Sequence, residues 1–447
     1  MADTFTVYIT ADTLLGGLAG REGRDESVAL LREAYVTRVV LEGYRGGRCV
    51  PESSLVAARD FYQAEGFETL GGLMPVYGEG FGARTVGVET RFSGFCFSQE
   101  ETGAALEAEI RKLARCFNKV VIDDAFLTSC RCASCETARR GRDWGEFRRA
   151  LLANVGRRWV AAVHEENVGG RLVVKFPQYY DRYARFGYDA ETFADVFDEV
   201  WQGTETRNPT TSLFGYTQPY QGYFNFRWMR ICAGEKLTTA WFDYLDCDEQ
   251  LFYEQAVTTF LAAPRDVTLF RYDTSLFGTS MMGRVSDALP ELLALREAAR
   301  EPRGVHIIMP PNADGGRDLF LADHLGMIGL PLVPATVIEP GMRSILLTAH
   351  AMEDEGIPAG VQQALLSGRQ VIVTADGLVR AAQRYPELLP FFGYERWGIA
   401  AIASDATRFE IEGKQFTSEV PYRLRADLQP LDAATQVSAK VFAFDGP

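Results

Sequence analysis

Two kinds of chemically useful side chain follow one short apolar run, KVVI, in the first third of the sequence. The adjacent acids Asp123 and Asp124 end the run, and three thiols come soon after them, Cys130, Cys132 and Cys135. Carboxylates at a strand end are candidates for acid–base or nucleophilic catalysis. Clustered cysteines in a reducing compartment indicate a metal more than disulfides. The sequence therefore predicts an acidic site and a metal clamp close together.

The three cysteines have the spacing C-x-C-x-x-C, which places three thiolates on one tight loop. A tetrahedral zinc needs a fourth ligand, and a structural site closes it with protein. We expect Cys96 to be that ligand, because it would lie on the loop after the preceding strand. Cys116 competes, but its helical pattern with Leu113 and Phe117 predicts a core position. Four thiolates leave no open coordination position, so the predicted zinc is structural. Free thiols or a redox pair are the alternative.

Acidic residues also end several other apolar runs. In chain order the candidates are Glu42, the pair Asp123 and Asp124, Glu205, the pair Asp243 and Asp246, and Asp273. In a barrel of parallel strands these ends meet around one mouth. The four histidines of the chain are too few to favour histidine-based metal catalysis or a Ser-His-Asp triad. Many carboxylates on one rim fit glycoside hydrolysis, in which one acid protonates the leaving oxygen and a second carboxylate attacks or activates water.

Asp123 and Asp124 are adjacent on a strand, so their side chains are expected to point to opposite faces. Only one of them would then reach the centre of the site. Glu205 is predicted two strands away, a separation across which two carboxylates can flank one glycosidic bond. Arg207 follows as a partner of Glu205 or a clamp on the substrate. For each acid alone, a rim salt bridge or a helix N-cap is the competing interpretation.

Lys175 interrupts the apolar run VVKF and needs a nearby acid if it is buried. We expect it to contact Asp123 or Asp124. A Schiff-base lysine, as in barrel aldolases, is the alternative. Aromatic and basic residues at strand ends, which suit stacking on a sugar and hydrogen bonding to its hydroxyls, include Tyr44, Arg45 and Trp241.

The elements that carry these residues alternate regularly over residues 1–300. Helical spacing is clearest from Trp144 to Val163 and in EETGAALEAEIRKLARCF, where Ser98 and Glu101 have the capping-box spacing. Eight strands that alternate with helices are typical of a (β/α)8 TIM barrel in the α/β class. The eight runs, nearly continuous in apolar residues as in a buried parallel sheet, are FTVYIT, TRVVLEGY, FETLGGLMPVYG, KVVIDD, GRLVVKFP, DEVWQGTE, TTAWFDYLD and DVTLFRYD.

A second alternating unit follows the charged stretch LREAAREPRGV. The runs GVHIIMP, GLPLVPATV, RSILLTAH and RQVIVTADG, with a helix around GVQQALLSG, predict a small Rossmann-like or flavodoxin-like α/β domain over residues 303–395. The runs RFEIEGKQF, EVPYRLRADL and AKVFAFDGP then predict antiparallel strands in a short β tail over residues 396–447.

Composition narrows the partners. The chain has 46 basic and 60 acidic residues and a net charge of −14, which disfavours nucleic acid and anionic membranes because both bind basic surfaces. The start MADTFTVYIT shows neither a basic n-region nor an apolar h-region, and no run reaches the length of a membrane span. We therefore expect a cytoplasmic protein with no nucleic-acid or membrane partner.

The stretches CFSQEETGAALEAEIRKLA and CRCASCETARRGRDWGEFRRALL, separated by an apolar strand that ends in acid, resemble the zinc region of the family 42 β-galactosidases. That resemblance implies a zinc ion held by Cys96, Cys130, Cys132 and Cys135. The segment RSILLTAHAMEDEGIPAGVQQALLSGRQVIVTADG is similar to the same family's trimerization domain, an amidotransferase-like fold, although no cysteine follows Cys247. It implies a homo-oligomer, a trimer or a dimer.

The acids depart from that family's pattern. Family 42 has an Asn-Glu pair on its fourth strand, where this chain has Asp123 and Asp124, and a glutamate on its seventh strand, where this chain has AWFDYLD. An aspartate on strand four and an acid on strand six look more like the α-galactosidase and α-fucosidase barrels. There the strand-four aspartate is the nucleophile. The resemblance thus implies a divergent glycoside hydrolase with Asp124 as nucleophile and Glu205 as general acid/base.

The sequence therefore predicts a retaining exo-glycosidase that acts on a small glycoside, with structural zinc and no organic cofactor. Two alternatives stand beside it: a catalytically inactive barrel that binds a carbohydrate, and a lysine-dependent lyase or aldolase that uses Lys175. The predicted substrate-binding or pKa-tuning residues are Asp123, Lys175, Arg207, Glu42, Tyr44, Arg45, Trp241, Asp243 and Asp246.

Overall fold

The computed structural model describes residues 5–87, 94–392, 394–398, 404–424, 427–430 and 439–443. The chain divides into two compact units. The first consists of residues 1–303 together with 322–331, and the second of residues 304–321 together with 332–447. Every predicted site residue belongs to the first unit.

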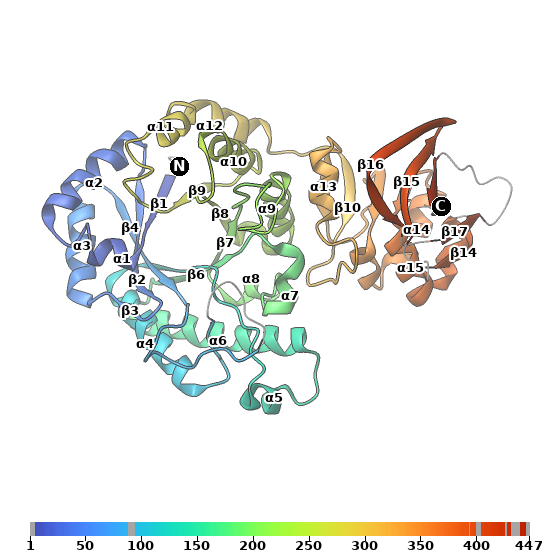
Figure 1. Ribbon diagram of the computed structural model, residues 1–447. Helices are drawn as coiled ribbons and strands as arrows, with labels where there is room; N and C mark the ends of the chain where they lie inside the picture. Colours follow the sequence, from blue (N-terminus) through green and yellow to red (C-terminus); the bar gives the residue numbers. More distant parts are fainter. Residues whose placement is uncertain are drawn as a thin grey trace. The chain divides into compact units, whose positions relative to one another are not determined.

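Eight parallel strands of the first unit form a closed barrel, which confirms the predicted TIM-barrel fold (Figure 1). Their order is β1-β9-β8-β7-β6-β5-β4-β2, and pairing of β1 with β2 closes the barrel. Each predicted apolar run supplies one strand, because strands buried on both faces need no polar alternation. The strands are β1 (Phe5–Ile9), β2 (Arg38–Arg45), β4 (Glu68–Met74), β5 (Lys119–Ile122), β6 (Arg171–Phe176), β7 (Glu199–Gly203), β8 (Leu237–Asp243) and β9 (Asp266–Phe270), and a short antiparallel strand, β3 (Arg48–Cys49), extends β2.

Helices surround the barrel (Figure 1). The helix predicted from Trp144 is confirmed as α6, and the Asp143 carboxylate caps its first turn by accepting from two backbone N–H groups. The longer helices of this unit are α2 (Arg21–Glu33), α3 (Glu52–Ala64), α4 (Glu100–Cys116), α6 (Trp144–Glu166), α9 (Tyr220–Ala233), α10 (Glu249–Leu261), α11 (Ser280–Asp287) and α12 (Leu289–Ala298). The shorter ones are α1 (Ala11–Leu15), α5 (Ala133–Arg139), α7 (Tyr183–Phe186) and α8 (Phe193–Val196).

The capping box predicted at the start of α4 is wrong. Gln99 is the N-cap residue, and its side chain makes no cap hydrogen bond. The Ser98 hydroxyl, expected to cap the helix, instead accepts a hydrogen bond from the Cys135 thiol with the two atoms 3.3 Å apart. A tertiary contact with the cysteine loop therefore replaces the local cap.

One side chain from each barrel strand fills the middle of the barrel. This layer consists of Tyr8, Val40, Leu70, Val121, Val173, Trp201, Trp241 and Phe270. Because side chains alternate along a strand, residues two positions later also face the interior, at the C-terminal end of the strands. On the strands that extend that far, those positions hold Glu42, Gly72, Lys175, Gly203 and Asp243. The barrel itself therefore brings charged residues to one mouth.

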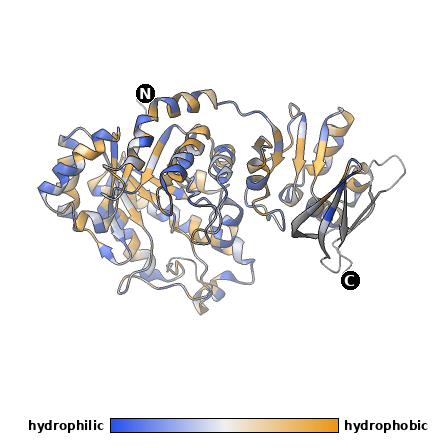
Figure 2. Ribbon diagram, turned by 45° about the horizontal axis from the view of Figure 1, so that its top comes forward, coloured by the Kyte–Doolittle hydropathy of each residue, from blue (hydrophilic) through white to orange (hydrophobic). Residues whose placement is uncertain are grey.

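The second unit contains a four-stranded parallel sheet in the order β11-β10-β12-β13. Its buried core includes Ile308, Ile345, Leu347 and Val361, and the strands carry the hydrophobic colours in Figure 2. The elements are β10 (Val305–Ile308), β11 (Leu332–Ala335), β12 (Ser344–Leu347), α14 (Ile357–Leu366), β13 (Gln370–Val373) and α15 (Ala375–Arg384), while most of α13 (Leu321–Met327) belongs to the first unit.

Antiparallel strands complete the second unit, as the sequence predicts. The run RFEIEGKQF is a hairpin and not one strand, because Glu412 and Gly413 both have positive φ and turn the chain. The last four residues of the run AKVFAFDGP lie outside the described residues. The strands are β14 (Tyr394–Gly398) paired with β17 (Asp427–Pro430), and β15 (Ser404–Ile411) paired with both β16 (Lys414–Leu424) and β18 (Ala439–Ala443).

Over the part of the chain that the structure describes, none of the helices combines the length and the apolar character that a bilayer crossing requires.

Candidate active site

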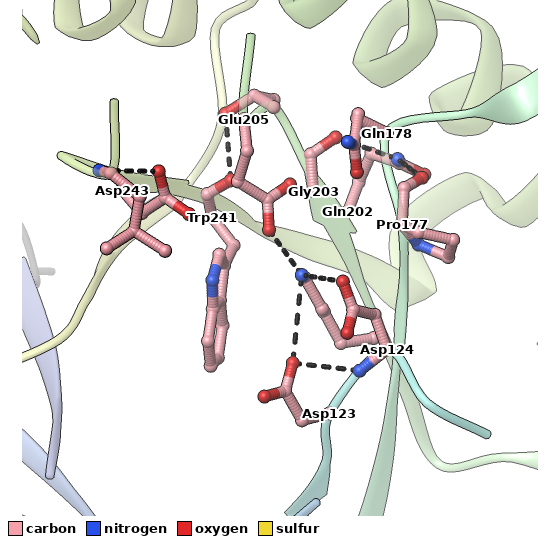
Figure 3. A network of polar contacts seen from close by, with 12 residues as sticks. Asp123, Asp124, Pro177, Gln178, Gln202, Gly203, Glu205, Trp241 and Asp243 are labelled. Atoms are coloured by element: carbon pink, nitrogen blue, oxygen red, sulfur yellow. Dashed lines mark hydrogen bonds and ion pairs between the residues drawn. The ribbon is translucent and has the colours of Figure 1, made fainter. Parts of the chain in front are cut away.

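Lys175 is the centre of the acidic cluster. It follows Val173 on the inward face of β6, and its side chain is 1% exposed. Its Nζ lies 3.0 Å from Asp124 Oδ2 and 3.7 Å from Asp123 Oδ1, and it also donates a hydrogen bond to Glu205 Oε1. The predicted contact of Lys175 with the aspartate pair is thus present, and Figure 3 shows the three carboxylates pointing toward one another.

The prediction that Asp123 and Asp124 point to opposite faces is wrong. Strand β5 ends at Ile122, so the alternation of a strand no longer applies to the two aspartates. The Asp124 backbone N–H donates to Asp123 Oδ1 at 2.8 Å, and the turn aims both carboxylates at Lys175. The Asp124 side chain is 19% exposed and that of Asp123 is 5% exposed. Asp124 is therefore the more accessible of the pair.

Glu205 lies just beyond β7 and is 2% exposed. A Cβ atom at Gly203 would lie 2.2 Å from Glu205 Oε2, so the absence of a side chain at Gly203 makes room for this carboxylate. Glu205 Oε1 accepts from Lys175, whereas the buried Oε2 has no hydrogen-bond partner among the residues that the structure describes. Oε2 of this buried carboxyl group is therefore available to hold a proton or to contact a ligand.

Arg207 makes its hydrogen bonds to Asp243 and not to Glu205, the partner that the sequence predicts. Its Nε lies 3.0 Å from both carboxylate oxygens of Asp243, and its guanidinium covers the Phe214 ring at 3.8 Å. The pair forms one wall of the mouth, with Arg207 partly exposed and Asp243 buried.

Glu42 and Arg45 form the opposite side of the cluster. Glu42 is fully buried and accepts hydrogen bonds from Tyr8 Oη at 2.7 Å, from the Ala11 backbone N–H at 2.7 Å and from Arg45 Nε. Arg45 also reaches Asp123 at 3.3 Å and so links the two acids.

Tyr44 and Asp246, predicted as substrate-binding residues, lie outside this cluster. The register of β2 against β4 shifts between Glu42 and Tyr44, and a Cβ atom at the intervening Gly43 would meet Leu113 of α4 at 2.8 Å. This irregularity turns Arg45 inward and buries Tyr44 against a pair of phenylalanine rings. Asp246 lies on the loop after β8 and accepts from the Thr211 hydroxyl.

Trp241 is in the barrel but is not an open stacking surface. It is 1% exposed, and its ring lies 4.8 Å below Lys175 Nζ in a cation–π contact.

Two tyrosines of the site were not predicted from the sequence. Tyr8 could have been found as the inward-facing residue of its strand, but Tyr188, whose hydroxyl donates to the Asp124 carbonyl, comes from a loop without a pattern.

A family model described as a probable glycosyl hydrolase catalytic domain matches residues 2–284. The chain belongs to this glycosyl hydrolase family. A second model, described as the second domain of the uncharacterized protein SSO3021, matches residues 301–399. That protein, from Saccharolobus solfataricus, is 23% identical over 372 residues. The match covers 75% of this chain and 60% of the relative, so the chain spans less than two thirds of the relative's length.

Solved glycosidases share the fold. The α-L-fucosidase isoenzyme 2 from Paenibacillus thiaminolyticus aligns with a TM-score of 0.67 at 12% identity, covering 98% of this chain and 74% of that one. A β-galactosidase from Bacillus circulans sp. alkalophilus aligns with 0.68 at 8% identity, covering 98% and 82%. A catalytic mutant of Gan42B, a GH42 β-galactosidase from G. stearothermophilus, aligns with 0.66 at 10% identity, covering 99% and 82%. The predicted resemblance is confirmed at the level of fold.

The glycosyl hydrolase domain has more acids than cations at its mouth. The described cluster holds the carboxylates of Glu42, Asp123, Asp124, Glu205 and Asp243 against the cations Arg45, Lys175 and Arg207. Burial raises the pKa of Glu205 to about 7, opposed by Lys175 and Arg207. Burial, with the charge of Asp124, raises the pKa of Asp123 to about 6. The cluster therefore favours a proton on a buried carboxyl group near neutral pH.

Lys175 keeps its charge in the same surroundings. Burial alone would lower its pKa, but the carboxylates of Asp124, Glu205 and Asp123 outweigh that effect and raise it above its ordinary value. Two carboxylate oxygens within hydrogen-bond distance of one nitrogen can be no more than about 6 Å apart. Asp124 and Glu205 therefore approach each other at one point of the mouth.

The cysteine cluster of this domain has the composition of a closed metal site. The sulfur atoms of Cys96, Cys130, Cys132 and Cys135 all lie within 4.8 Å of one another. Cys96 Sγ is 3.6 Å from the sulfurs of both Cys132 and Cys135. A tetrahedral zinc with bonds of about 2.3 Å places its sulfurs roughly 3.8 Å apart. The four residues thus fit a metal ion, and the competing candidate Cys116 is buried at the end of α4.

The barrel also has a cavity of about 340 Å³ at its other end. Its lining includes Phe5 and Val267, near the N-terminal ends of β1 and β9, and Thr37, just before β2. The cavity is therefore remote from the carboxylates, which occupy the C-terminal ends of the strands.

Proposed function

We propose that the protein is a retaining, exo-acting glycoside hydrolase that cleaves a small glycoside at the mouth of the barrel. The observation that supports this most is the approach of Asp124 and Glu205 to one ammonium group at the C-terminal strand ends. Retaining glycosidases hold their two carboxyl groups about 5–5.5 Å apart, whereas inverting enzymes separate them by about 6.5–9.5 Å to admit a water. Sharing Lys175 favours the closer arrangement.

The two carboxyl groups have different tasks. Glu205, whose pKa is about 7, donates its proton to the glycosidic oxygen as the leaving group departs. Asp124, which is the more exposed carboxylate, attacks the anomeric carbon and forms a covalent glycosyl-enzyme. Glu205 then accepts a proton from water, the water oxygen attacks the anomeric carbon, and Asp124 leaves as a carboxylate.

The substrate would meet the partly exposed cations of the rim. Arg45 and Arg207 each hold a buried carboxylate and still reach the surface of the mouth, so both are placed to hydrogen-bond sugar hydroxyl groups. Glu42, Asp123 and Asp243 fix these cations in position. Trp241 supports the cluster from below.

The remaining properties follow from the same proposal. A structural zinc on the four cysteines would hold the loop after β5, and with it the positions of Asp123 and Asp124. Hydrolysis by two carboxyl groups requires no organic cofactor. We also propose a cytoplasmic location and assembly into a dimer or trimer through the region after the barrel.

The lysine-dependent lyase is disfavoured by the contacts of Lys175. A Schiff base forms from an unprotonated amine. Three carboxylates hold this ammonium charged, two of them accept hydrogen bonds from it, and burial of the side chain keeps it from a carbonyl substrate.

Substitution of the proposed nucleophile tests the function and separates it from an inactive carbohydrate-binding barrel. On a panel of aryl glycosides, Asp124→Ala should lower turnover by on the order of 10³-fold or more. Added azide should restore product as a glycosyl azide of inverted anomeric configuration. The same substitution at Asp246, outside the cluster, should leave turnover nearly unchanged. Ligand binding by a wild-type protein that hydrolyses nothing on the panel would contradict the enzyme.

A further inference from the structure

Lys175 is enclosed by protein groups and does not reach the substrate. An ammonium group has three N–H donors, and three carboxylates surround this one, those of Asp123, Asp124 and Glu205. The indole of Trp241 closes the fourth side at 4.8 Å, and the residue is 1% exposed. A side chain so enclosed acts on the carboxylates and not on a sugar.

The position of Lys175 is set by the sheet and not by a flexible loop. The neighbouring strands β5 and β7 pair with β6 in register, with Ile122 opposite Val174 and Trp201 opposite Lys175. The chain then continues from those two strands directly into the aspartate pair and into Glu205. The ammonium is therefore built between the two strand ends that carry the proposed catalytic groups.

We propose that Lys175 is the positioning residue that assigns opposite roles to the two catalytic carboxyl groups. Its ammonium holds Asp124 and Glu205 together and places a positive charge beside the attacking carboxylate. One ammonium cannot neutralise three neighbouring carboxylates, and the excess negative charge leaves the proton on Glu205. This inference rests on the proposed glycosidase function, which it extends from two residues to three.

The groups that face Lys175 determine what its removal does. They are Asp123 and Asp124 after β5, Glu205 after β7 and Trp241 on β8, while Arg45 contacts Asp123 from β2 and Arg207 holds Asp243 beside Glu205. Without the ammonium, the three carboxylates repel one another in a largely buried site. The cluster then takes up protons at higher pH than in the wild type, which leaves fewer ionised carboxylates for the attack.

The first test is the pH–rate profile of Lys175→Met, a variant that keeps the unbranched side chain except for its terminal nitrogen. We expect turnover to fall on the order of 100-fold, and the acid limb of the profile to move up by about one pH unit or more. Lys175→Cys, alkylated with 2-bromoethylamine to restore an ammonium of nearly the same length, should move the limb back. An unchanged acid limb in Lys175→Met would overturn the inference even if turnover fell, because loss of packing alone does not shift a pKa.

Lys119→Met is the matched control. Lys119 pairs with the buried Glu199 at the other end of the barrel, 2.7 Å away, and lies outside the proposed machinery. Its removal should lower thermal stability and leave the acid limb in place.

A second test needs no activity. Removal of Lys175 alone leaves uncompensated buried charge, so Lys175→Met should lower the unfolding midpoint by several degrees at pH 8. Adding Asp124→Asn removes one of those charges and should recover part of the loss. If the midpoint shifts of the two substitutions simply add, or if the double variant does not fold, the inference is wrong. If they couple while the wild type hydrolyses no glycoside, the proposed function fails and the role of Lys175 as anchor of the carboxylates stands.

Discussion

Two buried glutamates at opposite ends of β7 show what distinguishes a structural acid from a reactive one. Glu199 begins the strand and Glu205 follows its end, and both are 2% exposed. Glu199 accepts from Lys119 Nζ at 2.7 Å, from Trp201 Nε1 at 2.8 Å and from the Thr238 hydroxyl. Glu205 shares the ammonium of Lys175 with two aspartates, and its Oε2 has no hydrogen-bond partner in the described structure.

The pKa values of the two glutamates move in opposite directions. Burial raises both, but Lys119 and the hydrogen bonds of Glu199 outweigh it, so that the pKa of Glu199 falls below its ordinary value. Burial prevails at Glu205 and raises its pKa to about 7. Equal burial therefore does not identify a functional acid. The supply of partners does, because a fully partnered carboxylate is held ionised whereas an under-partnered one can exchange a proton near neutral pH.

The largest difference in turnover should appear when the same substitution is made at each glutamate separately. Glu205→Gln removes the proton donor and should lower turnover by about 10²–10⁴-fold, with the fold retained. An aryl glycoside with a very good leaving group, which needs no proton, should recover most of the rate of its first step. Glu199→Gln should stay within a few-fold of the wild type per folded molecule. Similar losses of turnover in the two variants would remove the distinction between them.

The next largest effect should be a loss of stability when Glu199 is replaced. Glu199→Ala leaves Lys119 without its partner inside the barrel and should lower the free energy of unfolding by about 3 kcal/mol, the lower end for a broken buried pair because Lys119 is partly exposed. Denaturant unfolding measures this. Glu68→Ala, which removes an exposed carboxylate 3.8 Å from Arg38, is the control and should cost less than about 1 kcal/mol.

The pH dependence of stability should separate the same two residues. Glu205 has a folded pKa raised from 4.5 to about 7, so the folded state binds the proton more tightly than the unfolded state does. Its contribution to stability is complete below pH 4.5 and is lost as the pH rises to about 7. Glu205→Gln should flatten the fall of the unfolding free energy across that window. If the variant and the wild type show the same slope there, Glu205 does not carry the proton.

The sequence was sufficient to predict the barrel and the orientation of residues that lie within regular strands. An apolar run buried on both faces leaves few alternatives to a parallel strand, and alternation from Val173 then fixes Lys175 toward the interior. The cysteine spacing likewise needed only a tight loop and one partner, Cys96.

The errors lie where regular geometry ends. Asp123 and Asp124 follow the last residue of β5, where a turn and not a pleat directs them. Tyr44 was misplaced because packing of α4 against Gly43 shifts the register of β2, which no local pattern records. Arg207 has positive φ in a loop, so its choice of Asp243 over Glu205 depends on tertiary contacts. These positions required the assembled structure.

The smallest effect on turnover should come from substitution in the cysteine cluster. Like Glu199, which has all its hydrogen-bond partners within the protein, the four cysteines form a closed site. If four thiolates hold a structural metal, zinc content measured on the purified protein should be one ion per chain, and Cys132→Ser should lower it toward zero. The unfolding midpoint should fall by a few degrees, since the loop after β5 loses a clamp but the barrel keeps its core. Turnover per folded molecule should fall less than in any variant of the acid cluster. Cys49→Ser, which changes an exposed thiol outside the cluster, should alter neither quantity. Full stability of Cys132→Ser together with unchanged metal content would mean that the four sulfurs hold no ion, and that the strand end is held in place by β5 and β6 alone.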